Sequence, residues 1–125
     1  MTEAIDALPD LPGIDKAAGL RRLMNKPKLY EKVLCDFHAR FRNETQTLRA
    51  VIDSGDLATA ERMAHSAKGL AGTIGAGGLQ EIARLLEFAL HDSDPLWEDY
   101  FSSFEQELGQ VLTGIAQGFG IVDDN

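Results

Sequence analysis

The stretch AHSAKGLAGTIGAGGLQEIARLLE, residues 64–87, contains the strongest helix breaker of the chain between two helical patterns. The breaker is GAGG at 75–78, because glycine weakens a helix interior and favours turns. Before it, apolar residues recur at separations of three and four. After it, Leu79, Ile82 and Leu86 resume the same spacing. The stretch therefore predicts two helices joined by a tight turn.

The same periodicity extends in both directions along the chain. Pro27 suits the first turn of a helix, and apolar residues follow at separations of three, four and seven from Tyr30 to Ile52. We expect one helix of about seven turns there. The sequence SGD ends it, and Asp56 can cap the helix that precedes the glycine turn. A last helix is predicted over residues 96–115.

These patterns predict an all-α fold, since no window alternates apolar and polar residues as a strand does. Long amphipathic helices joined by short connections favour an antiparallel four-helix bundle. A short N-terminal helix at 16–24, capped by Asp15, would close one end. We divide the chain into an extended N-terminal lead at 1–13, the bundle at 14–116 and a flexible acidic tail at 117–125.

The composition of the 125-residue chain limits its function. With 20 acidic and 12 basic side chains the formal net charge is −8, which disfavours a nucleic-acid partner. The single cysteine, Cys35, cannot form an internal disulfide and suggests a reducing compartment. No apolar run approaches the roughly 20 residues of a membrane span, and the first residues lack the features of a signal peptide. We expect a cytoplasmic monomer without direct membrane insertion.

His65 faces away from the apolar side of its predicted helix. On a wheel of about 100° per residue, the apolar positions form an arc whose centre lies roughly 150° from this histidine. Mid-helix glycine costs about 1 kcal/mol relative to alanine, so glycines beside the ring should bring some benefit. We infer that they give another protein access to the imidazole. Its polar or glycine neighbours on this face are Glu61, Arg62, Lys68, Gly69 and Gly72.

The region 64–87 resembles the signature of histidine-containing phosphotransfer (HPt) domains. That signature has Ala-His, Lys-Gly three and four positions later, Gly-Ala, a following Leu and a closing Leu-Glu. One departure is Ala67, where a larger apolar residue is commoner in the family. The layout of the chain is similar to the family over about residues 14–115. The matching positions are Ala64, His65, Lys68, Gly69, Gly75, Ala76, Leu79, Leu86 and Glu87.

The resemblance implies a phosphocarrier without kinase activity of its own. His65 would accept a phosphoryl group, through Nε2, from an aspartyl phosphate of one receiver domain and pass it to another. Lys68 would lie next to that group, and Gly69 would leave room for the receiver. The receivers, which can belong to a hybrid sensor kinase, supply Mg²⁺, so no cofactor is expected on this chain. We expect Glu61, Arg62 and Gly72 to contribute to the docking surface.

The sequence disfavours two other functions and leaves a third open. A histidine kinase would need an ATP-binding domain, and its phosphoacceptor is typically followed by an acidic residue rather than Ser66. A metal site formed by His38, His65 and His91 lacks an HExxH motif, and we expect no metal there. His38 was instead expected on the surface and His91 at a helix end. The remaining alternative is an HPt-like helical adaptor that binds a receiver or another partner without being phosphorylated.

Overall fold

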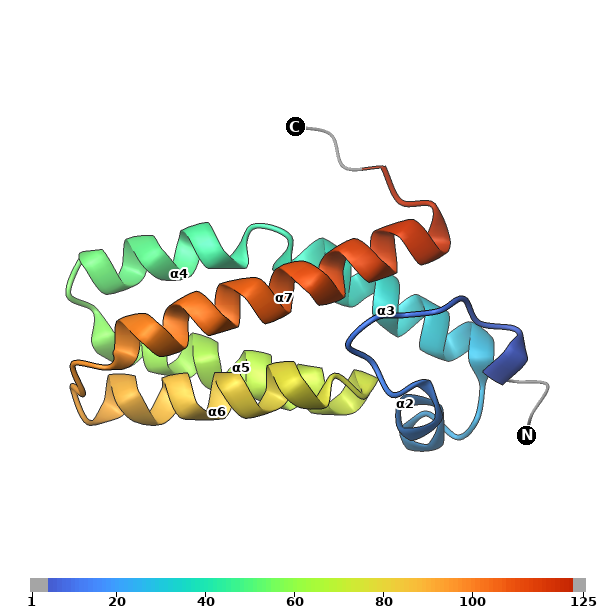
Figure 1. Cartoon of the computed structure of the whole chain (residues 1–125), viewed down its shortest axis with the longest axis horizontal. Coiled ribbons are helices and arrows are strands. Elements are labelled where there is room, and N and C mark those ends of the chain that lie inside the picture. Colours follow the sequence, from blue (N-terminus) through green and yellow to red (C-terminus); the bar gives the residue numbers. More distant parts are fainter. Residues whose placement is uncertain (1–4, 123–125) are drawn as a thin grey trace.

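The computed structural model describes residues 5–122 and contains no strand within that range. Figure 1 shows α5, α6 and α7 along the length of the molecule, with α3 and α4 following one another on the remaining side and α2 at one end. The all-α bundle with a short N-terminal capping helix is therefore confirmed. The helices are α2 (Lys16–Arg22), α3 (Pro27–Phe41), α4 (Glu44–Asp53), α5 (Leu57–Ile74), α6 (Gly77–His91) and α7 (Trp97–Phe119).

The helix ends follow the local signals of the sequence. The Asp15 carboxylate accepts a hydrogen bond from the Ala18 N–H, and the Asp56 carboxylate accepts one from the Thr59 N–H, both at 3.1 Å. These contacts satisfy backbone donors that have no partner inside a helix. At the other end of α5, Gly75 adopts a left-handed conformation with φ +86°. Glycine adopts it without a Cβ clash, which allows the sharp turn into α6.

The prediction of a single helix from Pro27 to Ile52 is wrong, because a short non-helical segment separates α3 from α4. The residues at the interruption are Arg42 and Asn43, and α4 starts afresh at Glu44. Phe41 and Leu48 are both buried on either side of the break. Their seven-residue separation therefore matched one continuous helix although the backbone changes direction between them.

The core combines small residues of α5 with large ones of the other helices. Ala60, Ala64, Ala67 and Ala71 of α5 are each at most 1% exposed. Small side chains let neighbouring backbones approach closely, so α5 lies in the centre of the packing. The hydroxyl of the fully buried Tyr30 donates a hydrogen bond of 2.6 Å to the Ile74 carbonyl, which ties α3 to the end of α5.

The segment before α2 packs onto α7. Leu8 and Leu11 are buried in the core, and Pro12 lies where a side chain at Gly114 would otherwise point. At the C-terminal end, α7 continues to Phe119, beyond residue 116 where the sequence placed the end of the bundle. The last part of the predicted acidic tail, 123–125, lies outside the described residues. No helix within residues 5–122 is both long and apolar enough to cross a bilayer.

Candidate functional site

The α5–α6 hairpin sets the geometry around His65. The two helices are antiparallel, and their register places residue 65 opposite residue 87 and residue 61 opposite residue 91. We call the line along which these side chains meet the α5–α6 seam. His65 is on the solvent side of this seam, with 65% of its side chain exposed. The predicted outward orientation of this residue is confirmed.

The Glu87 carboxylate holds the His65 ring by one of its two nitrogens. His65 Nδ1 lies 2.8 Å from Glu87 Oε2. An ionised carboxylate can only accept a hydrogen bond, so the neutral imidazole donates one from its Nδ1–H to Glu87. The other nitrogen, Nε2, then carries the lone pair. This contact therefore sets both the tautomer and the orientation of a nucleophilic nitrogen.

Lys68 contacts the other oxygen of the same carboxylate. Its Nζ lies 2.8 Å from Glu87 Oε1, and the Glu87 side chain is only 16% exposed. Burial raises the pKa of Glu87, but the hydrogen bonds and positive charge of Lys68 and His65 outweigh burial, so the net pKa is lowered. Glu87 is therefore ionised at neutral pH. In the sequence, Glu87 is the closing glutamate of the HPt-like signature and has no predicted role, because its contacts with His65 and Lys68 depend on the register between α5 and α6.

Three of the four predicted docking residues lie on the surface beside His65. A Cβ at Gly69 would meet nothing within 4 Å, so the backbone there is open to a partner. Arg62 is exposed and donates a hydrogen bond of 3.0 Å to the Thr59 hydroxyl. Glu61 is paired with His91, whose Nδ1 lies 3.1 Å from Glu61 Oε1.

The prediction that Gly72 offers bare backbone to a partner is wrong. Gly72 is buried, and a Cβ at this position would lie 2.5 Å from the side-chain nitrogen of Gln80. The side chain of Gln80 reaches from α6 over α5 and occupies the space beside Gly72. The helical wheel placed Gly72 on the outward face of an isolated helix, and α6 covers that part of the face.

The three histidines do not converge. His38 is 3% exposed, so the expectation of a surface position is wrong for this residue. His91 is the last residue of α6, as expected, and 64% of its side chain is exposed. Within residues 5–122, no three His, Cys, Asp or Glu side chains are grouped closely enough to hold a metal ion.

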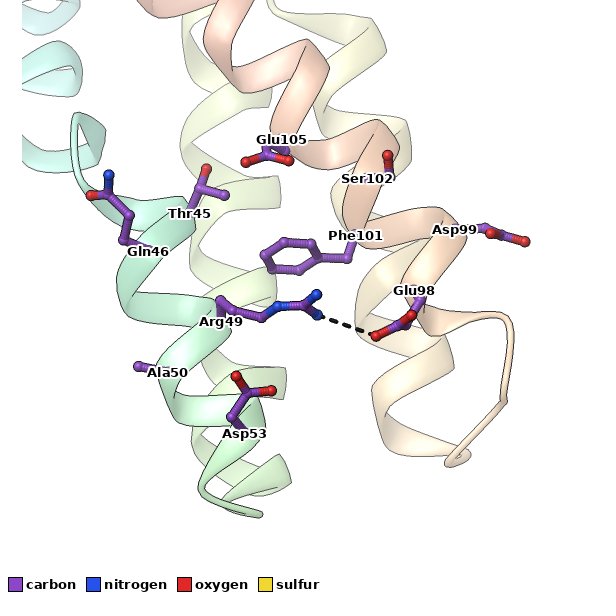
Figure 2. Close-up of a pocket in the computed structure, with 10 residues that line it drawn as sticks. All are labelled: Thr45, Gln46, Arg49, Ala50, Asp53, Glu98, Asp99, Phe101, Ser102 and Glu105. Atoms are coloured by element: carbon purple, nitrogen blue, oxygen red, sulfur yellow. Dashed lines mark hydrogen bonds and ion pairs between the residues drawn. The ribbon is translucent and has the colours of Figure 1, made fainter.

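A hollow of about 710 Å³ lies between α4 and α7, away from the seam. Figure 2 shows Arg49 reaching across it to Glu98, with Phe101 beside the guanidinium group. The Arg49 guanidinium carbon lies 5.0 Å from the centre of the Phe101 ring. The residues that line the hollow include none of His65, Lys68 and Glu87, so the hollow is not part of the candidate site.

A comparison with known protein families identifies the family of this chain. The family described as Hpt domain matches residues 32–118, which include all of α5 and α6. The chain belongs to the Hpt domain family, whose members are histidine phosphocarriers in phosphorelays. The part of the seam that holds His65, Lys68 and Glu87 lies within the matched region.

A solved structure supports the fold over nearly the whole chain. It is the crystal structure of the HPT domain from a Hpt sensor hybrid histidine kinase of Shewanella, with a TM-score of 0.77 and 19% sequence identity. The similarity covers 92% of this chain and 100% of that one. Among curated proteins, the search found no match.

Proposed function

We propose that this protein is a histidine phosphotransfer protein of a two-component phosphorelay and that His65 is its phosphoacceptor. A single observation carries the proposal: Glu87 engages His65 Nδ1 at 2.8 Å, which leaves Nε2 as the nucleophilic nitrogen of an exposed ring. Family membership agrees with this assignment. The contribution of the bundle is to present a neutral imidazole in a fixed orientation.

The transfer step follows from this arrangement. The Nε2 lone pair attacks the phosphorus of an aspartyl phosphate on a receiver domain, and an N–P bond forms as the P–O bond to the aspartate breaks. The aspartate leaves as a carboxylate with the electron pair. Positive charge that develops on the ring is stabilised through Nδ1–H by the Glu87 carboxylate. The reverse step passes the phosphoryl group to a second receiver.

Lys68 and Gly69 support this step in different ways. The Lys68 ammonium is held beside the ring by its contact with Glu87, so a cation is available to the phosphoryl oxygens. Gly69 adds no side chain in the space next to His65, which lets a receiver approach. Arg62 and Glu61 lie at the edge of the same surface and would contact the docked partner.

The remaining assignments follow from this role. The partners are receiver domains, including that of a hybrid sensor kinase, and Mg²⁺ belongs to the receiver, so the chain needs no cofactor. It acts as a phosphocarrier without kinase activity of its own. We place it in the cytoplasm as a monomer, without a nucleic-acid partner and without insertion in a membrane.

Replacing His65 by glutamine tests the proposal. We expect His65→Gln to keep the fold, because the side chain is exposed, and to abolish acid-labile labelling by a phosphorylated receiver. His91→Gln is a matched control, since it changes another exposed histidine of the same seam and should leave labelling intact. Label retained on the His65 variant would show that the assigned residue is wrong. A wild-type protein that binds the receiver but accepts no label would favour the adaptor function.

A further inference from the structure

The hollow between α4 and α7 is an open groove between two helices that do not pack closely on each other. The buried residues of α4 are Leu48 and Ile52, and the helix packs mainly against α5. Within residues 5–122, one polar contact crosses the hollow, at 3.4 Å between Arg49 Nη1 and Glu98 Oε1. The volume of about 710 Å³ is within the roughly 300–1,000 Å³ range of binding pockets.

The floor of this groove is aromatic and already holds one cation. Phe101 is 6% exposed, and the Trp97 ring meets it edge-on with the ring centres 6.2 Å apart. The Arg49 guanidinium lies over both rings, 5.5 Å from the centre of Trp97 and 5.0 Å from that of Phe101. Ring faces attract cations in this geometry. The groove therefore binds a guanidinium group of the protein itself.

Negative charge in the groove exceeds the charge of this one arginine. Figure 2 shows Asp53 and Glu98 at one end of the hollow and Glu105 at the other, whereas Asp99 points away from it. In the described part of the chain, neither Asp53 nor Glu105 forms an ion pair. Three carboxylates thus face one guanidinium group, and the groove is complementary in charge to a cationic partner.

The spacing of the carboxylates indicates the shape of that partner. Glu98 and Glu105 are seven positions apart on α7, which is about 10 Å along the helix axis. Two basic side chains that are seven positions apart on another helix have the same separation and lie on one face of it. A small cation could occupy one end of the groove only, whereas two turns of a helix reach both ends.

We propose that the α4–α7 groove is a docking site for a cationic helix of a partner protein. One basic side chain pairs with Asp53 and Glu98, a second one pairs with Glu105, and the helix surface between them covers the aromatic floor. The groove lies away from the α5–α6 seam, so this partner and a receiver can be bound at the same time. The inference goes beyond the proposed function and does not depend on it.

Two synthetic peptides of identical composition test this site. Each is an alanine-rich helix of about 15 residues with two arginines. In the first peptide the arginines are seven positions apart on one face, and in the second they are five positions apart on opposite faces. Fluorescence anisotropy at about 0.15 M salt, where long-range attraction is screened, compares their binding. We expect the second peptide to bind about fivefold more weakly, because it reaches only one end of the groove.

Matched variants separate the groove from the general negative charge of the protein. Asp53→Asn with Glu105→Gln removes one carboxylate from each end of the groove and should weaken binding of the first peptide by about tenfold. Asp6→Asn with Glu31→Gln removes the same charge from exposed residues outside the groove and should change binding little. Circular dichroism would show that both variants remain helical. Amide NMR shifts should map to residues 45–53 and 98–105.

The docking site is overturned if neither peptide binds, if both bind equally, or if the two double variants lose the same affinity. Self-association of the protein that disappears with Asp53→Asn and Glu105→Gln would assign the groove to a second copy and also overturn it. Saturating peptide should leave labelling of His65 by a phosphorylated receiver unchanged, and a block of labelling would refute simultaneous binding. Absence of labelling without peptide would count against the proposed function alone.

Discussion

At the scale of single residues, one carboxylate organises the candidate site. Glu87 contacts both His65 and Lys68 through different oxygens, each at 2.8 Å. It therefore orients the nucleophile and holds the cation near it at the same time. Removing its charge would loosen both groups, so the residue is a positioning residue for the proposed transfer.

The lowered pKa of Glu87 predicts a pH-dependent contribution to stability. Because the folded pKa is below that of glutamate in an unfolded chain, about 4.3, the contribution is complete above that pH. It is lost as the pH falls through the lower folded value. We expect Glu87→Gln to cost about 1 kcal/mol of unfolding free energy at pH 7, as for an ion pair near the surface. The cost should become smaller as the pH falls below about 4.3.

Urea unfolding of both proteins between pH 7 and pH 3 measures this difference. Glu31→Gln is the control, since Glu31 is exposed and its substitution should have an effect that does not change with pH. A Glu87→Gln cost that stays constant down to pH 3 would contradict the assigned ion pairs.

At the scale of helices, the position of the seam depends on the turn between α5 and α6. The Gly75 carbonyl accepts a hydrogen bond of 2.8 Å from the Asp15 N–H, so the turn is also where α2 is attached. A Cβ on Gly75 would lie 2.3 Å from the Asp15 carbonyl oxygen. This glycine is thus required by both its left-handed conformation and its close contact with another segment.

Substituting Gly75 by alanine separates these two requirements when it is compared with Gly55→Ala. Gly55 has nearly the same φ, +84° against +86°, but a Cβ there would meet nothing within 4 Å. We expect a loss of about 1 kcal/mol for Gly55→Ala from backbone strain alone. Gly75→Ala should lose about 3 kcal/mol, because the backbone contact must also open. Equal losses in urea unfolding would show that the α2 contact contributes nothing.

At the scale of the whole molecule, the bundle extends beyond the helices that carry the site. Leu8 and Leu11, in the segment predicted as an extended lead, are only 7% and 5% exposed. Pro9 and Pro12 of the same segment lie against Gly118 and Gly114 of α7. The segment thus covers part of the core on the α7 side, away from the α5–α6 seam.

This packing predicts a stability role that is independent of phosphoryl transfer. Leu8→Ala combined with Leu11→Ala should lower the free energy of unfolding by about 3 kcal/mol, since each substitution removes a buried side chain. The cost stays at this level because the N-terminal segment can shift to fill part of the cavities that are left. Labelling of His65 should be unchanged. Leu29→Ala with Leu96→Ala is the matched control, because both residues are exposed and should cost little. Equal losses for the two pairs in urea unfolding would contradict the burial of the N-terminal segment.

The helical class, the glycine turn and the outward face of His65 were all predictable from the sequence. These properties depend on spacing and backbone preference within about four residues, which a single chain displays directly. The caps at Asp15 and Asp56 were predictable for the same reason.

Which side chains contact one another depends on the packing of separate helices. The pairing of His65 with Glu87, the covering of Gly72 by Gln80 and the burial of His38 all depend on how separate helices pack. The interruption between α3 and α4 escaped the periodicity because the apolar spacing continues across it. Periodicity shows which face of a helix is apolar, but the register between two helices is set by their connecting turn and by packing across the whole core.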